Sequence, residues 1–131
     1  MLGEDSPESV LAREEVKPIV SAEILAGLRR LLAAVTTEPG LVDYVVDIVR
    51  ETRREPSLLA GAGPRATQGL LLSARANAAV SGRDFVTPDD VKLMAVPVLA
   101  HRMVLRPEFE IEGLTVEEVV EKLLTKVAVP R

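Results

Sequence analysis

The chain has no cysteine, a single histidine at His101 and very few aromatic residues. Without cysteine it forms no disulfide and offers no thiolate ligand, and one histidine cannot anchor a multi-histidine metal site. Aromatic residues make up 2% of the sequence, so platforms on which nucleic-acid bases could stack are nearly absent. We therefore predict no metal site.

The sequence also lacks a positive charge excess and a long apolar run. Sixteen basic residues stand against 20 acidic ones, a net charge of -4, which provides no field to attract a phosphate backbone. No apolar run approaches the roughly 18 residues that a membrane span requires, and the polar, acidic start does not resemble a secretory signal. We predict a cytoplasmic protein with no nucleic-acid partner and no membrane association.

What the sequence does contain is aliphatic. Hydrophobic residues make up 47% of 131 residues, mostly Leu, Val, Ile and Ala, which suits close helix packing in a single domain. Apolar residues recur at helical spacing in five segments. The prediction is an all-α fold, a small bundle of four to five helices, with helices expected at 21–35, 41–54, 64–80, 87–102 and 115–126.

Two segments fall outside this helical pattern. Residues 1–17 are polar and read as a linker or leader with at most a short helix, so the domain is expected to occupy 18–131. Near 107–112, Phe109 and Ile111 alternate with glutamates, which predicts a short extended arm. The glutamates alternate rather than converge, so a solvated face is favoured over a metal or acid/base site.

Helix starts carry the clearest local signals. Ser21, Thr87 and Thr115 each precede an apolar-periodic run and are good N-caps, and Asp90 follows Thr87 at capping-box spacing. The third helix, opened by Pro64, is apolar on most faces and should occupy the centre of the bundle. We expect four of its residues to be buried: Leu70, Leu71, Ala74 and Ala78.

The sequence contains no complete phosphate-binding motif. The P-loop pattern GxxxxGK[ST] is absent. Residues 61–66 (GAGPRA) match the G-x-G-x-x-A string of a dinucleotide fingerprint, but the strand and βαβ unit that this fingerprint requires are not present. Arg65 nevertheless stands in the first turn of a helix, where a cation is disfavoured and an anion offsets the cost. Its guanidinium, with the backbone at Gly63 and Ala66, could bind phosphate oxygens; the alternative is an arginine that simply points into solvent.

Four separated motifs together resemble the C-terminal lid of MoxR-type AAA+ ATPases. They are residues 61–66 (GAGPRA), 82–91 (GRDFVTPDDV), 98–102 (VLAHR) and 112–114 (EGL), and the resemblance runs from about residue 20 to residue 131. It implies a lid-type helical bundle in which Arg65 is the sensor 2 arginine. It also implies ATP and Mg bound by a core in the full-length protein, hexameric rings whose ATP hydrolysis drives chaperone-like remodelling, and partners that often carry metal-ion-dependent adhesion domains.

The resemblance leaves some points open. The family pattern usually has Ser where this chain has Gly63, which removes a side-chain cap. His101 and Arg102 match a recurrent family pair, for which we expect packing or an inter-subunit contact. Because the chain has no Walker A or Walker B motif and no convergent catalytic set, it is not expected to be an enzyme alone. A self-standing helical interaction module and a histone-fold-like unit are the alternatives.

Overall fold

The computed structural model describes residues 9, 11, 13 and 17–130, in two compact units. The first unit ends at Leu31 and the second comprises Leu32–Arg131. Most of the expected leader at 1–17 lies outside the described residues, so its short helix and the boundary after residue 17 stay predictions. None of the described helices is both long and apolar enough to cross a membrane.

The first unit contains helix α2, Ala22–Leu31. The predicted cap forms, because the Ser21 hydroxyl accepts a hydrogen bond of 3.2 Å from the backbone N–H of Ile24. The apolar side chains of α2 follow helical spacing and are all exposed: Ile24, Leu25, Leu28 and Leu31. The remainder of the helix predicted at 21–35 is a 3₁₀ turn, η1 (Leu32–Ala34), which belongs to the second unit.

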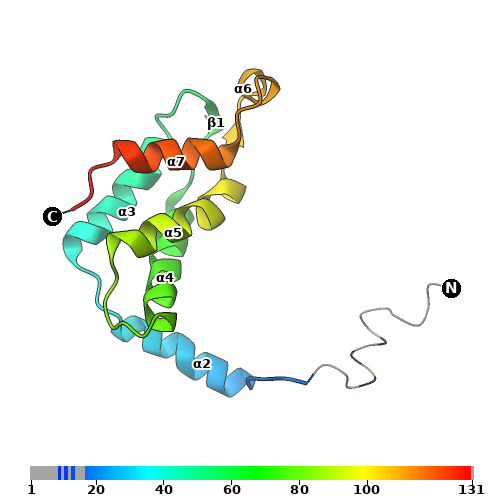
Figure 1. The fold of residues 1–131 in the computed structure, drawn as a ribbon, viewed down its shortest axis with the longest axis vertical. Helices are drawn as coiled ribbons and strands as arrows, with labels where there is room; N and C mark the ends of the chain where they lie inside the picture. Colours follow the sequence, from blue (N-terminus) through cyan, green and yellow to red (C-terminus); the bar gives the residue numbers. More distant parts are fainter. Residues whose placement is uncertain (1–8, 10, 12, 14–16, 131) are drawn as a thin grey trace. The chain divides into compact units, whose positions relative to one another are not determined.

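The second unit is built from four main helices, α3 (Pro39–Thr52), α4 (Pro64–Val80), α5 (Pro88–Leu99) and α7 (Val116–Lys126). Helix α4 packs against α3 and α5, and α7 lies across the same two helices (Figure 1). This arrangement confirms the all-α prediction. Apart from Thr52, the largest fully buried side chains are aliphatic, as the composition required: Ile48, Leu70, Leu99, Leu123, Val45, Val91, Val119 and Val120.

Helix α4 has the central place that its composition predicted. Leu70, Ala74 and Ala78 are fully buried, whereas Leu71 is only half-buried. The two alanines follow Leu70 at intervals of four residues, so the three side chains lie on one narrow, buried face of the helix. Leu72 is 54% exposed, which shows that α4 is not surrounded on every side.

A small antiparallel pair of strands closes one end of this unit. Strand β1 (Leu58–Ala60) pairs with β2 (Val104–Leu105), with Leu58 opposite Leu105. The prediction of an extended arm near 107–112 is wrong, because this segment forms the short helix α6 (Pro107–Ile111). Proline is suited to the first helical position and glutamates to the first turn, and Gly113, at a φ of 90°, follows the helix end.

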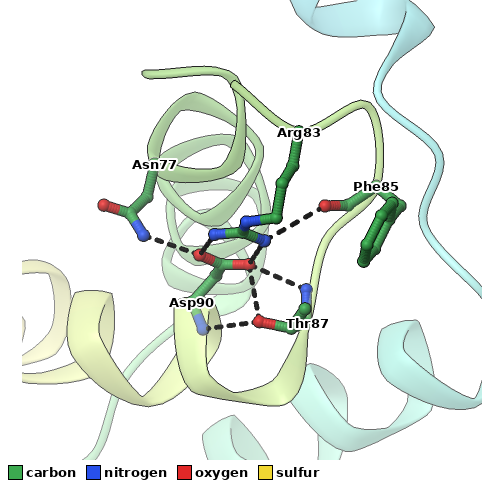
Figure 2. Close-up of polar contacts among 5 residues, drawn as sticks. All are labelled: Asn77, Arg83, Phe85, Thr87 and Asp90. Atoms are coloured by element: carbon green, nitrogen blue, oxygen red, sulfur yellow. Dashed lines mark hydrogen bonds and ion pairs between the residues drawn. The ribbon is translucent and has the colours of Figure 1, made fainter. Parts of the chain in front are cut away.

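The start of α5 is held by a buried carboxylate (Figure 2). Thr87 and Asp90 form the predicted capping box, and the Asp90 carboxylate also accepts hydrogen bonds from Arg83 at 2.6 and 2.7 Å and from Asn77 at 2.6 Å. Its contacts therefore join the end of α4, the connecting segment and the first turn of α5. The Arg83 hydrogen bonds hold the pKa of Asp90 well below its ordinary value, so the side chain stays ionised although it is only 2% exposed.

Candidate functional site at the start of helix α4

Arg65 is the second residue of α4, and no acidic side chain of the first turn balances its charge. Its side chain is exposed, and across the described part of the chain it has neither an ion pair nor a hydrogen-bond partner. The first turn of α4 contains no acidic residue, and the N-cap Gly63 provides no side-chain cap. A guanidinium at the positive end of a helix dipole is disfavoured by about 0.3–1 kcal/mol, and a bound anion offsets that cost.

The backbone around Arg65 contributes less to a possible anion site than the sequence suggested. The N–H of Ala66 already donates to the carbonyl of Gly63 at 2.9 Å, so an anion at this turn would share that donor. Gly63 itself is extended (φ −91°, ψ 178°) and exposed. The guanidinium is therefore the main group that this turn offers to a phosphate.

The loop that precedes α4 lies against the end of α3. The N–H of Ala62 donates to the Thr52 hydroxyl at 2.9 Å, and Arg53 Nε donates to the Ala62 carbonyl at 3.0 Å. A Cβ added to Gly61 would lie 2.7 Å from the carbonyl carbon and oxygen of Thr52. Thr52 and Ala62 are fully buried. The position of the Arg65 turn is therefore tied to α3.

The His101–Arg102 pair ends α5 in the 3₁₀ turn η2 (Ala100–Arg102), and both side chains are exposed. Arg102 Nη2 lies 3.9 Å from the position of a Cβ added to Gly69, which is one turn beyond Arg65 on α4. His101 Nδ1 is 3.1 Å from the Pro97 carbonyl. The structure thus brings Arg102 to the helix that carries Arg65. The role of His101 and Arg102 in packing or between subunits stays a prediction.

Glu55 is a second buried carboxylate, and its neighbours were not predicted from the sequence. Its oxygens accept a hydrogen bond from Lys126 at 3.0 Å and one from Ser57 at 3.2 Å, and Lys122 lies at 3.5 Å. Burial alone would raise the pKa of Glu55, but these two hydrogen bonds and the lysine charges together lower it. The contacts tie the segment after α3 to α7.

Acidic and histidine side chains do not gather into a metal site in the part of the chain that is described. No group of three or more His, Asp or Glu residues there is arranged to hold a metal ion. Glu108 and Glu110 belong to α6 and are exposed, as is Glu112 after it.

Comparison with known proteins agrees with the motifs. The AAA lid domain family matches residues 50–123, more than half of the chain. Protein YeaC of Bacillus subtilis is 36% identical over 117 residues, covering 89% of this chain and 37% of that protein. Chaperone MoxR1 of Mycobacterium tuberculosis is 36% identical over 126 residues, covering 89% of this chain and 33% of that protein.

A solved structure has the same fold. The crystal structure of a proposed ATPase from Cytophaga hutchinsonii superposes with a TM-score of 0.81 at 30% identity, covering 96% of this chain and 44% of that chain. The chain spans about a third of the length of the curated relatives it matches. Because these matches show a lid-domain fold, the histone-fold alternative is wrong. The chain belongs to the AAA lid domain family and is homologous, over most of its length, to the lid region of MoxR-type proteins.

Proposed function

We propose that Arg65 is the sensor 2 arginine of a MoxR-type AAA+ ATPase, and that this lid reports the state of ATP bound by the core of the same polypeptide. The observation that carries the proposal is an exposed arginine in the first turn of α4 that has no partner among the described residues, on a turn anchored to α3. Such an arginine can leave the surface of its own domain at little cost, because no internal contact has to be broken.

The chemistry of this position suits a terminal phosphate. A guanidinium can bind two phosphate oxygens at once, and in a cleft that excludes water it stabilises charge that develops on the transferred phosphoryl group. When the γ-phosphate leaves, Arg65 loses this contact and the lid is free to reorient relative to the core. Hydrolysis would in this way be converted into movement of the ring. The core would supply the P-loop and Mg²⁺.

The same resemblance extends to partners. We include in the proposal a hexameric ring in the cytoplasm, with neighbouring subunits against the lid, chaperone-like remodelling of client proteins, and clients that carry metal-ion-dependent adhesion domains. If the domain acted instead as a self-standing interaction module, its binding to a client protein would be the same with ATP, with ADP and without nucleotide.

The proposal is tested with Arg65→Ala in the ATPase in which this lid is joined to its core. We expect kcat to fall roughly 100-fold, as for the loss of one transition-state donor, with the fold unchanged by circular dichroism. The matched control is Arg54→Ala, because the Arg54 side chain is 73% exposed and forms a surface ion pair with Glu51 at 2.9 Å. If Arg65→Ala turns over ATP as fast as Arg54→Ala, the sensor assignment fails.

A further inference from the structure

Helix α4 differs from α5 and α7, and resembles α3, in that no side chain caps its start. Helices α5 and α7 begin with threonine capping boxes, Thr87 with Asp90 and Thr115 with Glu118. Helix α4 begins with Gly63, and no side chain caps its first turn. A helix start without a local cap depends on contacts with the rest of the fold for its position.

Those contacts come from Thr52, the last residue of α3. Its buried hydroxyl donates to the Val49 carbonyl at 2.7 Å, which fixes the direction of the O–H group. The oxygen lone pairs are then available to the N–H of Ala62, which donates to them at 2.9 Å. The end of one helix thus orients the hydroxyl that holds the approach to the next.

Arg53 and Gly61 complete this contact. The carbonyl of Ala62 accepts from Arg53 Nε at 3.0 Å, so both backbone polar groups of this buried residue are bonded to the end of α3. Gly61 allows the approach, since any Cβ there would overlap the α3 backbone. Only Gly63 and Pro64 separate Ala62 from Arg65, and the ring of Pro64 restricts the backbone further.

We propose that Thr52 is a positioning residue for Arg65, acting through its hydrogen bond to Ala62. This inference rests on the proposed function of Arg65 and adds the group that orients it. An arginine that must meet a phosphate in the transition state is sensitive to small displacements, because a shift of about 1 Å can reduce the rate roughly 100-fold. Val49, Thr52 and Ala62 therefore control the turn from which the guanidinium extends.

The experiment compares Thr52→Val with Thr52→Ser in the lid joined to its core. Valine keeps the shape of the side chain but removes the hydroxyl, whereas serine keeps the hydroxyl. We expect Thr52→Val to lower kcat about tenfold or more with little change in the KM for ATP, and Thr52→Ser to restore most of the activity. Tyr44→Phe is the matched control, because Tyr44 is buried in the same helix and its hydroxyl has no hydrogen-bond partner within the described part of the chain.

Two further measurements separate positioning from general damage. In NMR spectra of this chain, the amide of Ala62 should shift and exchange faster in Thr52→Val, and return in Thr52→Ser. If Thr52→Val fails to fold, Arg53→Ala removes the second contact to Ala62 from an exposed side chain and should lower kcat in the same direction.

A double-mutant comparison decides the inference. If Thr52 acts through Arg65, Thr52→Val should lower kcat no further once Arg65 is alanine. An equal loss in both backgrounds, or wild-type turnover by Thr52→Val beside a crippled Arg65→Ala, would overturn the positioning role and leave the proposed function standing. Wild-type turnover by Arg65→Ala would overturn both.

Discussion

Replacing Asp90 by alanine should lower the free energy of unfolding of this domain by about 3 kcal/mol. The Asp90 side chain is 2% exposed and accepts hydrogen bonds from Arg83, Asn77 and Thr87 (Figure 2). Alanine would leave Arg83 without its ionic partner and three other donors, Asn77 Nδ2 and the N–H and O–H groups of Thr87, without their acceptor. It would also remove the capping box of α5, which by itself contributes about 1 kcal/mol.

The magnitude follows from the burial of the pair. Removing one partner of a buried ion pair costs about 3–5 kcal/mol, and the lower end applies here because the Arg83 side chain is 29% exposed and can turn towards water. Since domains of this size are stable by only about 5–15 kcal/mol, the loss is a large fraction of the total. It corresponds to a decrease in Tm of roughly 12–24 °C.

The assay is urea unfolding followed by far-ultraviolet circular dichroism, in which the midpoint should fall while the slope m stays the same. Asp89→Ala is the matched control, because Asp89 occupies the same helical turn with a side chain that is 92% exposed and lies 3.9 Å from Lys92. That variant should leave the midpoint nearly unchanged. If Asp90→Ala proves as mild as Asp89→Ala, the buried carboxylate does not hold the link between α4 and α5.

Two further predictions concern pH and the contact between α3 and the α4 loop. Because Arg83 holds the pKa of Asp90 below its unfolded value of about 3.9, the stability that the carboxylate adds is complete above that pH and is lost as the pH falls further. The difference in unfolding free energy between wild type and Asp90→Asn should therefore shrink between about pH 5 and pH 2 in urea titrations, and a constant difference would refute this. Gly61→Ala should cost about 1–3 kcal/mol in thermal unfolding, since its Cβ would meet the α3 backbone. Gly63→Ala, whose Cβ would meet nothing within 4 Å, should cost less than about 1 kcal/mol, and equal losses would mean that the loop shifts freely.

Helix positions were well predicted because their start signals are local. An N-cap residue bonds to a backbone N–H two or three positions later, so Ser21, Thr87 and Thr115 carry their information within one turn. Proline at Pro64 marks the beginning of α4 in the same way. The burial of Leu70, Ala74 and Ala78 followed from helical periodicity alone.

The segment after β2 was mispredicted because a short alternation of apolar and acidic residues fits both a strand and one turn of helix. Extended structure forms at Val104–Leu105 instead, where the partner strand Leu58–Ala60 supplies hydrogen bonds. Residues 107–111 have no strand partner in the described sheet, so the helix-starting properties of Pro107 prevail.

The candidate site was likewise predicted only where its signal is local. Its central arginine was recognisable from the sequence, because a cation in a first helical turn is unusual for a reason that depends only on neighbouring residues. The surroundings of that arginine were not recognisable. Thr52 lies in a run of charged residues, and its spacing does not distinguish it. Nothing in the sequence near Glu55 predicts its contact with the lysines of α7.

The sequence by itself determined the helical class, the starts of the main helices and the exposed arginine at the start of α4, because caps, periodicity and helix-end charge act within a few residues. Only the tertiary structure decided that Thr52 bonds to the loop before α4 and that Arg102 lies beside Gly69, one turn beyond Arg65. It also decided that the buried carboxylates of Asp90 and Glu55 meet partly exposed cations, Arg83 and Lys126. Each of these contacts joins different elements, and a hydrogen bond or ion pair between them exists only after helix packing has brought both partners within about 3–4 Å.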